Sequence, residues 1–291
     1  TRRPLYYLSA AGVINVVLNL LFVITFRMDV AGVAAATVIS QCISAFLIIR
    51  CMMKEQSDIR LELSALHIYP DKFRRILQIG LPASFQGIVF SFSNVIIQSS
   101  VNSFGAVTVA GNSAAANIEG FVYVSMNAFH QAAISFTSQN VGAAKYERVN
   151  RILYTAQACV ITVGVVFGNL AVLCGYPLLG MYTSSSAVME AGMKRLAVIC
   201  RYYALCGMMD VIVGSLRGLG YAMMPMIVSL IGACGLRLVW IFTFFRMESF
   251  HTTTSLYMTY PVSWIVTFLA HVVCFIIVRR KLERKWNCVK A

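Results

Sequence analysis

The residues best suited to chemistry in this sequence are two carboxylates, Glu119 and Asp210, that lie within long apolar stretches. Away from water, a carboxylate is stable only if it takes up a proton, binds a cation or meets a partner charge. Such a group can bind and release a charge as its surroundings change. We therefore expect Glu119 to be the leading site of cation or proton coupling and Asp210 to be the second.

Polar residues follow Glu119 at helical spacing. Steps of four, four and three residues put these side chains on one face of a helix: Glu119, Tyr123, Asn127 and His130. The stripe would be about 16 Å long. His130 suits either a proton relay near neutral pH or a hydrogen bond to a neighbouring group. His271 is a weaker candidate for a relay.

A second polar stripe precedes the first. Asn94, Gln98 and Asn102 recur every four residues, and Gln86 lies two turns earlier. The two stripes predict one cavity lined by Gln86, Asn94, Gln98, Tyr123, Asn127 and His130. The alternative is that the amides only connect neighbouring helices through hydrogen bonds.

Arginines within the same apolar stretches are candidate partners of the two acids. Counting residues from the segment ends places Arg201 at the depth of Glu119, and Asp210 within reach of Arg217 or Arg237. If these ion pairs are permanent, the acids are structural. If the pairs are transient, they are switches.

The composition indicates which kind of structural element carries these residues. Hydrophobic residues make up 59% of the 291 residues, charged residues only 12%, and the mean hydropathy is +0.75. The chain is therefore an integral membrane protein. Eight apolar segments are long and continuous enough to be membrane-spanning helices, so the fold is an all-α bundle: 5–26, 31–50, 76–103, 108–139, 152–175, 188–216, 225–245 and 257–278.

The distribution of basic residues predicts the orientation. If every segment crosses, one side collects 18 of the 24 lysines and arginines, in the chain start, the 50–75 stretch, the 145–151 loop, Arg217 and the 279–290 tail. The other side keeps Arg27, Lys194, Arg195 and Arg246. The rich side is cytoplasmic by the positive-inside rule, which puts both ends of the chain in the cytoplasm.

Polar breaks suggest four parts. Residues 1–50 hold two helices, 51–75 form a cytoplasmic linker, 76–280 form a six-helix lobe, and 281–291 are a basic tail. The segment from Pro4 to Met28 ends in ITFRM, and that from Pro225 to Met247 ends in TFFRM, which hints at an internal repeat. With Thr1 in first place, the chain reads as a fragment of a 6+6 transporter that lacks four helices.

The sequence contains no motif typical of an enzyme or of a nucleotide-binding protein. The sequence contains no glycine-rich nucleotide loop, no zinc-protease motif and no nucleophile elbow, and its nine cysteines are scattered singly. We expect no enzyme activity, no cofactor, no bound metal and no nucleic-acid partner. The expected surroundings are a lipid bilayer and small organic molecules.

Several strings in order resemble the multidrug and toxic compound extrusion (MATE) family, in its bacterial multidrug-exporter branch. They cover most of the chain: GLP at 80–82, NSFG at 102–105, NIE at 117–119, SQNVGA at 138–143, RGLGYAMMP at 217–225 and GLRLVW at 235–240. The resemblance implies two six-helix lobes around a central cavity, of which this chain holds the second lobe and the last two helices of the first.

The resemblance also implies a function. Such a protein is a secondary antiporter of the bacterial plasma membrane, monomeric when full length, that exports amphipathic and often cationic compounds as Na⁺ or H⁺ moves inward. Glu119 matches an acid of this branch, and Asp210 matches acids of the second lobe less closely. Asn94 stands where some relatives carry an acid.

Two other functions remain open at this point. A lipid-linked oligosaccharide flippase has a related architecture, but its cavity should carry more basic charge than Arg201 and Arg237 provide. An intramembrane enzyme using Glu119 and His130 as acid and base would need a second cluster at the same depth, and the sequence offers none.

Overall fold

The computed structural model describes the backbone of residues 2–55 and 60–290, with side chains for 5–55, 60–78 and 80–283. The expected basic residues Arg2 and Arg3, part of the linker and the end of the basic tail therefore lie outside the described side chains. In the part of the chain that is described, the fold is helical and contains no strand, which confirms the all-α prediction. The chain divides into two compact units, Thr1–Pro70 and Asp71–Ala291.

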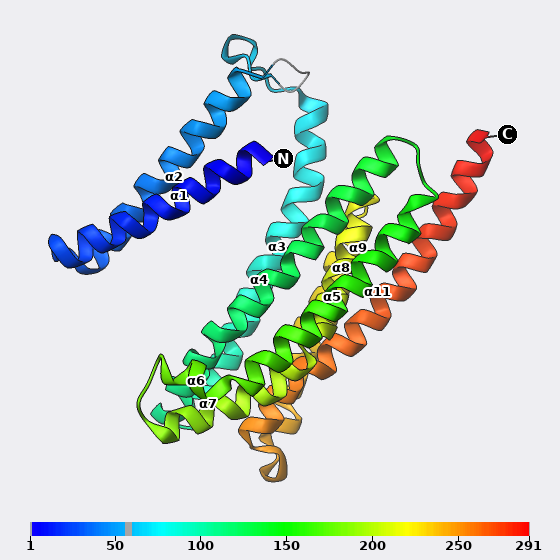
Figure 1. Cartoon of the computed structure of the whole chain (residues 1–291). Helices are drawn as coiled ribbons and strands as arrows, with labels where there is room; N and C mark the ends of the chain where they lie inside the picture. Colours follow the sequence, from blue (N-terminus) through cyan, green and yellow to red (C-terminus); the bar gives the residue numbers. More distant parts are fainter. Residues whose placement is uncertain (1, 56–59, 291) are drawn as a thin grey trace. The chain divides into compact units, whose positions relative to one another are not determined.

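The first unit is a pair of helices (Figure 1). Helix α1 (Arg2–Leu20) continues through a wider turn at Leu21–Thr25, and α2 (Asp29–Met53) returns beside it. One face of α2 buries small residues at every fourth position: Gly32, Ala36, Ser40 and Ser44. Small side chains let two membrane helices approach closely, and Asn15 adds a hydrogen bond to Ser40 of 3.1 Å.

The second unit contains the remaining long helices (Figure 1). They are α3 (Pro70–Asn102), α4 (Ala106–Gly142), α5 (Arg148–Leu173), the short α6 (Gly175–Gly180), α7 (Ser186–Ile199), α8 (Tyr203–Gly218), α9 (Met223–Ser229), α10 (Leu236–Phe242) and α11 (Thr253–Lys290). A tight turn at Cys200–Tyr202 joins α7 to α8, and a wide turn at Leu230–Gly235 joins α9 to α10, so each pair forms one continuous span.

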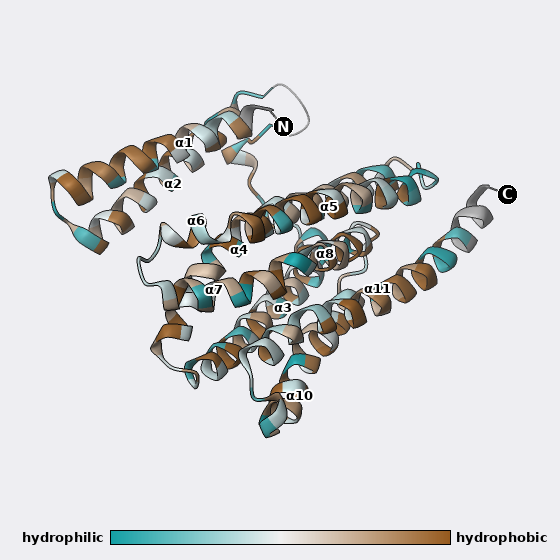
Figure 2. Cartoon of the chain, turned by 60° about the horizontal axis from the view of Figure 1, so that its bottom comes forward, coloured by the Kyte–Doolittle hydropathy of each residue, from teal (hydrophilic) through white to brown (hydrophobic). Residues whose placement is uncertain are grey.

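Seven of the described helical segments are long and apolar enough to cross a membrane. The eighth expected span, 108–139, lies in α4, which has 37 residues but is less apolar because it carries the polar stripe of Glu119. The long helices otherwise carry mostly hydrophobic residues along their lengths (Figure 2). Two boundaries differ from expectation: α3 begins at Pro70 rather than 76, and α11 continues through the expected tail, where no proline or glycine ends it.

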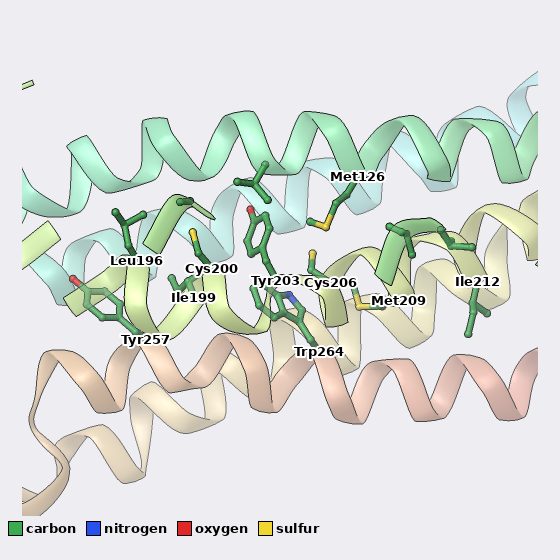
Figure 3. Packing of buried hydrophobic residues seen from close by; sticks show 14 of the residues in the cluster. Met126, Leu196, Ile199, Cys200, Tyr203, Cys206, Met209, Ile212, Tyr257 and Trp264 are labelled. Atoms are coloured by element: carbon green, nitrogen blue, oxygen red, sulfur yellow. The ribbon is translucent and has the colours of Figure 1, made fainter. Parts of the chain in front are cut away.

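Helix α4 lies at the centre of the second unit and packs against α5, α7 and α8. The core between them contains Met126, Leu196, Ile199, Cys206 and Met209, with Tyr203 edge-on to Trp264 (Figure 3). Glycines permit the closest approaches: a Cβ at Gly168 would lie 2.2 Å from the backbone oxygen of Cys200, and one at Gly111 would lie 2.6 Å from that of Val188.

The contact at Gly168 gives a test of this packing. We expect Gly168→Ala to lower the free energy of unfolding by about 1–3 kcal/mol, because the methyl group overpacks against a backbone atom. Gly120→Ala is the matched control, since nothing lies within 4 Å of its added Cβ. Thermal unfolding of both variants in detergent checks this, and equal stability of the two would contradict the packing.

Candidate functional site

Glu119 is held in a buried ion pair with Arg195. Arg195 donates from Nε to Oε1 and from Nη2 to Oε2 of Glu119, each at 2.7 Å, and only 5% of Glu119 is exposed. This parallel, two-bond geometry is the strongest form of the arginine–carboxylate interaction. Both carboxylate oxygens of Glu119 are therefore engaged.

The prediction that Arg201 pairs with Glu119 was wrong. Arg201 is exposed in the turn after α7, and Arg195, expected on the outer side, is buried instead. Counting residues estimated the depth of each arginine but not the face of the helix on which it lies. Six residues correspond to roughly 240° around a helix, so only one of the two arginines can face α4.

The ion pair continues into a chain of amides. Nη1 of Arg195 donates to Asn112 Oδ1 at 2.7 Å, Asn112 Nδ2 donates to Gln98 Oε1 at 2.9 Å, and Gln98 donates to Asn102 at 3.1 Å. This chain links α7 through α4 to α3. Asn112 was not among the residues predicted from the sequence, although it lies seven residues before Glu119 and so shares its helical face.

Aromatic residues of α11 surround the two buried arginines. The guanidinium of Arg195 lies 5.6 Å from the ring centre of Tyr257 and 5.7 Å from that of Tyr260. The guanidinium of Arg237 lies 4.3 Å from Tyr260, and its Nε donates to Ser263 at 2.9 Å. Both arginines are thus within cation–π distance of one ring. Tyr257, Tyr260 and Trp264 are spaced so that they share one helix face. This spacing could have identified them from the sequence, and the sequence analysis did not include them.

Asp210 lies in a cavity of about 540 Å³ within the second unit. The cavity brings together most of the side chains predicted from the sequence: Gln86, Asn94, Tyr123, Asn127, His130, Asp210, Arg217 and Arg237. A neighbouring cavity of about 340 Å³ shares Asn94 and Tyr123 with it and is also lined by Gln98 and Glu119. The two polar stripes therefore face one pair of adjoining cavities.

The expected ion pairs of Asp210 are not formed. Among the described residues, its carboxylate has neither a hydrogen bond nor an ion pair. Arg217 donates to Gln86 at 2.7 Å instead, and Arg237 is held by Ser263 and Tyr260. Arg217 lies two turns after Asp210 on the same face of α8 and lines the same cavity. Asp210 is thus an acid open to the cavity, with a counter-charge nearby.

The two histidines make local contacts. Nδ1 of His130 lies 2.6 Å from the backbone oxygen of Asp210, so a proton on this nitrogen is donated to that carbonyl. His271 lies fully buried with Nε2 at 3.0 Å from Ser229 Oγ, and it lines neither polar cavity. His130 therefore ties α4 to α8 at the residue that carries the open carboxylate.

The pairing of Glu119 gives a direct prediction. Arg195→Gln should lower the free energy of unfolding by about 3–5 kcal/mol, because it leaves a buried carboxylate without its counter-charge. Arg201→Gln, which changes an exposed arginine nearby, should be almost neutral. Thermal unfolding of both variants measures the difference.

A double variant completes this experiment. Adding Glu119→Gln to Arg195→Gln should recover much of the lost stability, because two neutral amides replace an uncompensated charge. Stability losses that simply add would contradict the ion pair, as would an Arg201→Gln variant as unstable as Arg195→Gln.

Comparison with known proteins shows which proteins this chain resembles. Among curated proteins, the chain is 29% identical over 244 residues to the probable multidrug resistance protein YpnP of Bacillus subtilis, covering 81% of this chain and 53% of the relative. It is 21% identical over 220 residues to the multidrug export protein MepA of Staphylococcus aureus, covering 73% and 47%. The chain thus spans about half the length of the curated relatives it matches.

Solved structures show the same fold. The chain superposes on the MATE transporter VcmN of Vibrio cholerae in its bent form with a TM-score of 0.77 at 18% identity, covering 95% of this chain and 62% of the other. It superposes on an outward-facing multidrug resistance MATE transporter with a TM-score of 0.81 at 17% identity, covering 94% and 61%. The MatE family model matches residues 82–243, more than half of the sequence. The chain belongs to the MatE family of multi-pass membrane transporters.

Proposed function

We propose that this chain forms part of a cation-coupled antiporter that exports amphipathic organic compounds. The observation that carries the proposal is the polar cavity of the second unit, where the open carboxylate of Asp210 lies beside Tyr123, Asn127 and His130. Curated relatives described as multidrug resistance and multidrug export proteins support the choice of substrate class. A bacterial plasma membrane is the setting that fits these relatives.

The contacts of the two acids support different roles for them. A cation that binds Glu119 must compete with Arg195, which donates to both of its oxygens. Asp210 has no such bonds in the described part of the chain and lies at a cavity wall. We therefore place cation or proton coupling first at Asp210, and give Glu119 a structural role, which reverses the order expected from the sequence.

Competition at Asp210 provides the coupling. A carboxylate in a partly dry cavity attracts either an inward-moving Na⁺ or H⁺ or a cationic substrate. When the ion binds, it removes the charge that holds the substrate, and the substrate is released. The two flows are coupled because each ligand weakens the binding of the other.

The cavity suits organic molecules in size and lining. Its volume of about 540 Å³ falls within the range of drug-sized sites. Tyr203, Tyr260 and Trp264 line it together with Phe90, and aromatic faces attract organic cations. The amide groups of Asn94 and Asn127 add hydrogen-bonding positions that can also supply oxygen atoms to Na⁺.

A flippase for pyrophosphate-linked sugars would need a strongly basic cavity. Three arginines line the two cavities, but Arg195 is neutralised by Glu119 and Arg217 lies near Asp210. Among the described residues, only Arg237 lines these cavities without an acid beside it. Three arginines against two acids do not make the strongly basic lining that a flippase would need.

Efflux measurements test the proposal. With the full gene expressed in an exporter-deficient bacterium, we expect Asp210→Asn to reduce ethidium efflux at least about tenfold, because the exchangeable charge is lost. Asp71→Asn, which removes an exposed acid at the start of α3, is the matched control. Protein amounts in the membrane are measured alongside.

Ion gradients then identify the coupling. Inverted vesicles given a Na⁺ gradient or a pH gradient show which ion drives transport, and Asp210→Asn should abolish the response to that gradient. Undiminished gradient-driven efflux in Asp210→Asn would refute the role of Asp210. A response lost equally in Asp71→Asn would also refute it.

A further inference from the structure

An apolar groove lies between α4 and α5, separate from the polar cavities. Its volume is about 640 Å³, and it shares no lining residue with either cavity. From α4 it is lined by Phe129, Ala132, Ala133, Phe136 and Asn140. Ala132 and His130 are two residues apart and so point roughly 200° away from each other around α4.

One face of α5 forms the other wall of the groove. Its residues follow helical spacing from the first residue of the helix: Arg148, Arg151, Ile152, Thr155, Ala156 and Cys159. Charge is confined to one end, where the exposed side chains of Arg148 and Arg151 lie one turn apart. The remaining α5 positions are apolar or small.

The length of the groove matches half a bilayer. Cys159 lies 11 residues after Arg148, which corresponds to about 16 Å along α5. The hydrocarbon core of one leaflet is about 15 Å thick. The groove is therefore about as long as one acyl chain, with two arginines at one end.

A second groove on the same two helices provides a comparison. It has a volume of about 600 Å³ and begins near the other end of α5, between Phe121, Phe167 and Leu170. No charged residue lines it, and Ser125 and Tyr182 are among its few polar side chains. The two ends of the α4–α5 interface thus offer similar apolar space but differ in charge.

We propose that the groove with the two arginines binds an anionic phospholipid of the cytoplasmic leaflet. The phosphate pairs with Arg148 and Arg151, and one acyl chain lies between Phe129 and Phe136. Guanidinium groups match phosphate oxygens in geometry and charge, and the positive end of the α5 dipole adds to the attraction. A zwitterionic lipid gains less, because its own ammonium group already accompanies the phosphate.

This site is independent of the transport proposal. Its occupant touches a different face of α4 from the one that carries the polar stripe, and it touches α5 along its first three turns. A bound lipid would brace the two helices from outside and stabilise the fold. The site therefore has its own measurable property, the preference for anionic over neutral lipid.

Native mass spectrometry of the purified full-length protein tests the proposal. After exchange into mixed micelles of phosphatidylglycerol and phosphatidylcholine, the wild type should retain phosphatidylglycerol preferentially. Arg148→Gln with Arg151→Gln should reduce that preference on the order of tenfold, since each basic residue near a membrane surface contributes to anionic-lipid binding. Lys72→Gln with Lys281→Gln removes the same charge outside the groove and should retain the preference.

A second variant tests the apolar part of the site. Ala132→Trp fills the groove without changing its charge, so it should reduce retention of phosphatidylglycerol while leaving the arginines in place. Added phosphatidylglycerol should raise the unfolding temperature of the wild type and of the lysine control, but not that of the arginine double variant. Inorganic phosphate should not reproduce this increase, because it lacks the acyl chain.

Several outcomes would overturn the proposal. They are equal retention of the two lipids by the wild type, an unchanged preference in the arginine double variant, an equal loss in the lysine control, and protection by inorganic phosphate alone. A polypeptide found bound in the groove in place of lipid would overturn it as well.

Discussion

The fold of the second unit depends on the buried ion pair between Arg195 and Glu119. Two ions are removed from water there, and the arrangement is stable only because every polar atom of the carboxylate is matched. The guanidinium also bonds Asn112, which bonds Gln98, so one charge pair fixes α7, α4 and α3 together. The bond from Arg217 to Gln86 attaches α3 to α8 at a second place, and the buried side chains of Ile97 and Val101 pack into the core.

The charges of the two cavities are arranged differently. Arg195 pairs with Glu119, whereas Asp210 shares its cavity with Arg217 and Arg237 and forms an ion pair with neither. Arg237 is held by the face of Tyr260 and the hydroxyl of Ser263, which favour a cation without neutralising it. The cavity surface therefore carries one acid without a bonded partner, two arginines and several aromatic rings.

Sequence reasoning identified the fold and much of the cavity wall but not its bonds. Hydropathy is enough to find the helices, and spacing of three or four residues is enough to group Gln86, Asn94, Tyr123 and Asn127, because both patterns are properties of one helix at a time. Choosing Arg195 rather than Arg201 requires the relative rotation of α7 and α4, which depends on tertiary packing such as the close approach of Gly111 to Val188. The contribution of Tyr260 was missed for the same reason: it depends on where α11 meets two other helices.

The two acids differ in burial, and therefore in whether their surroundings can change. A ligand that bound equally well in every arrangement of a transporter would drive no transport, so a coupling group must experience different surroundings in different arrangements. Glu119 is 5% exposed and both its oxygens are bonded within a single unit, so its surroundings stay constant as long as that unit stays folded. Asp210 faces a cavity, and its surroundings change whenever water, an ion or an organic molecule enters. The fixed pair thus supplies the frame, and Asp210 is the acid to which the proposed coupling is assigned.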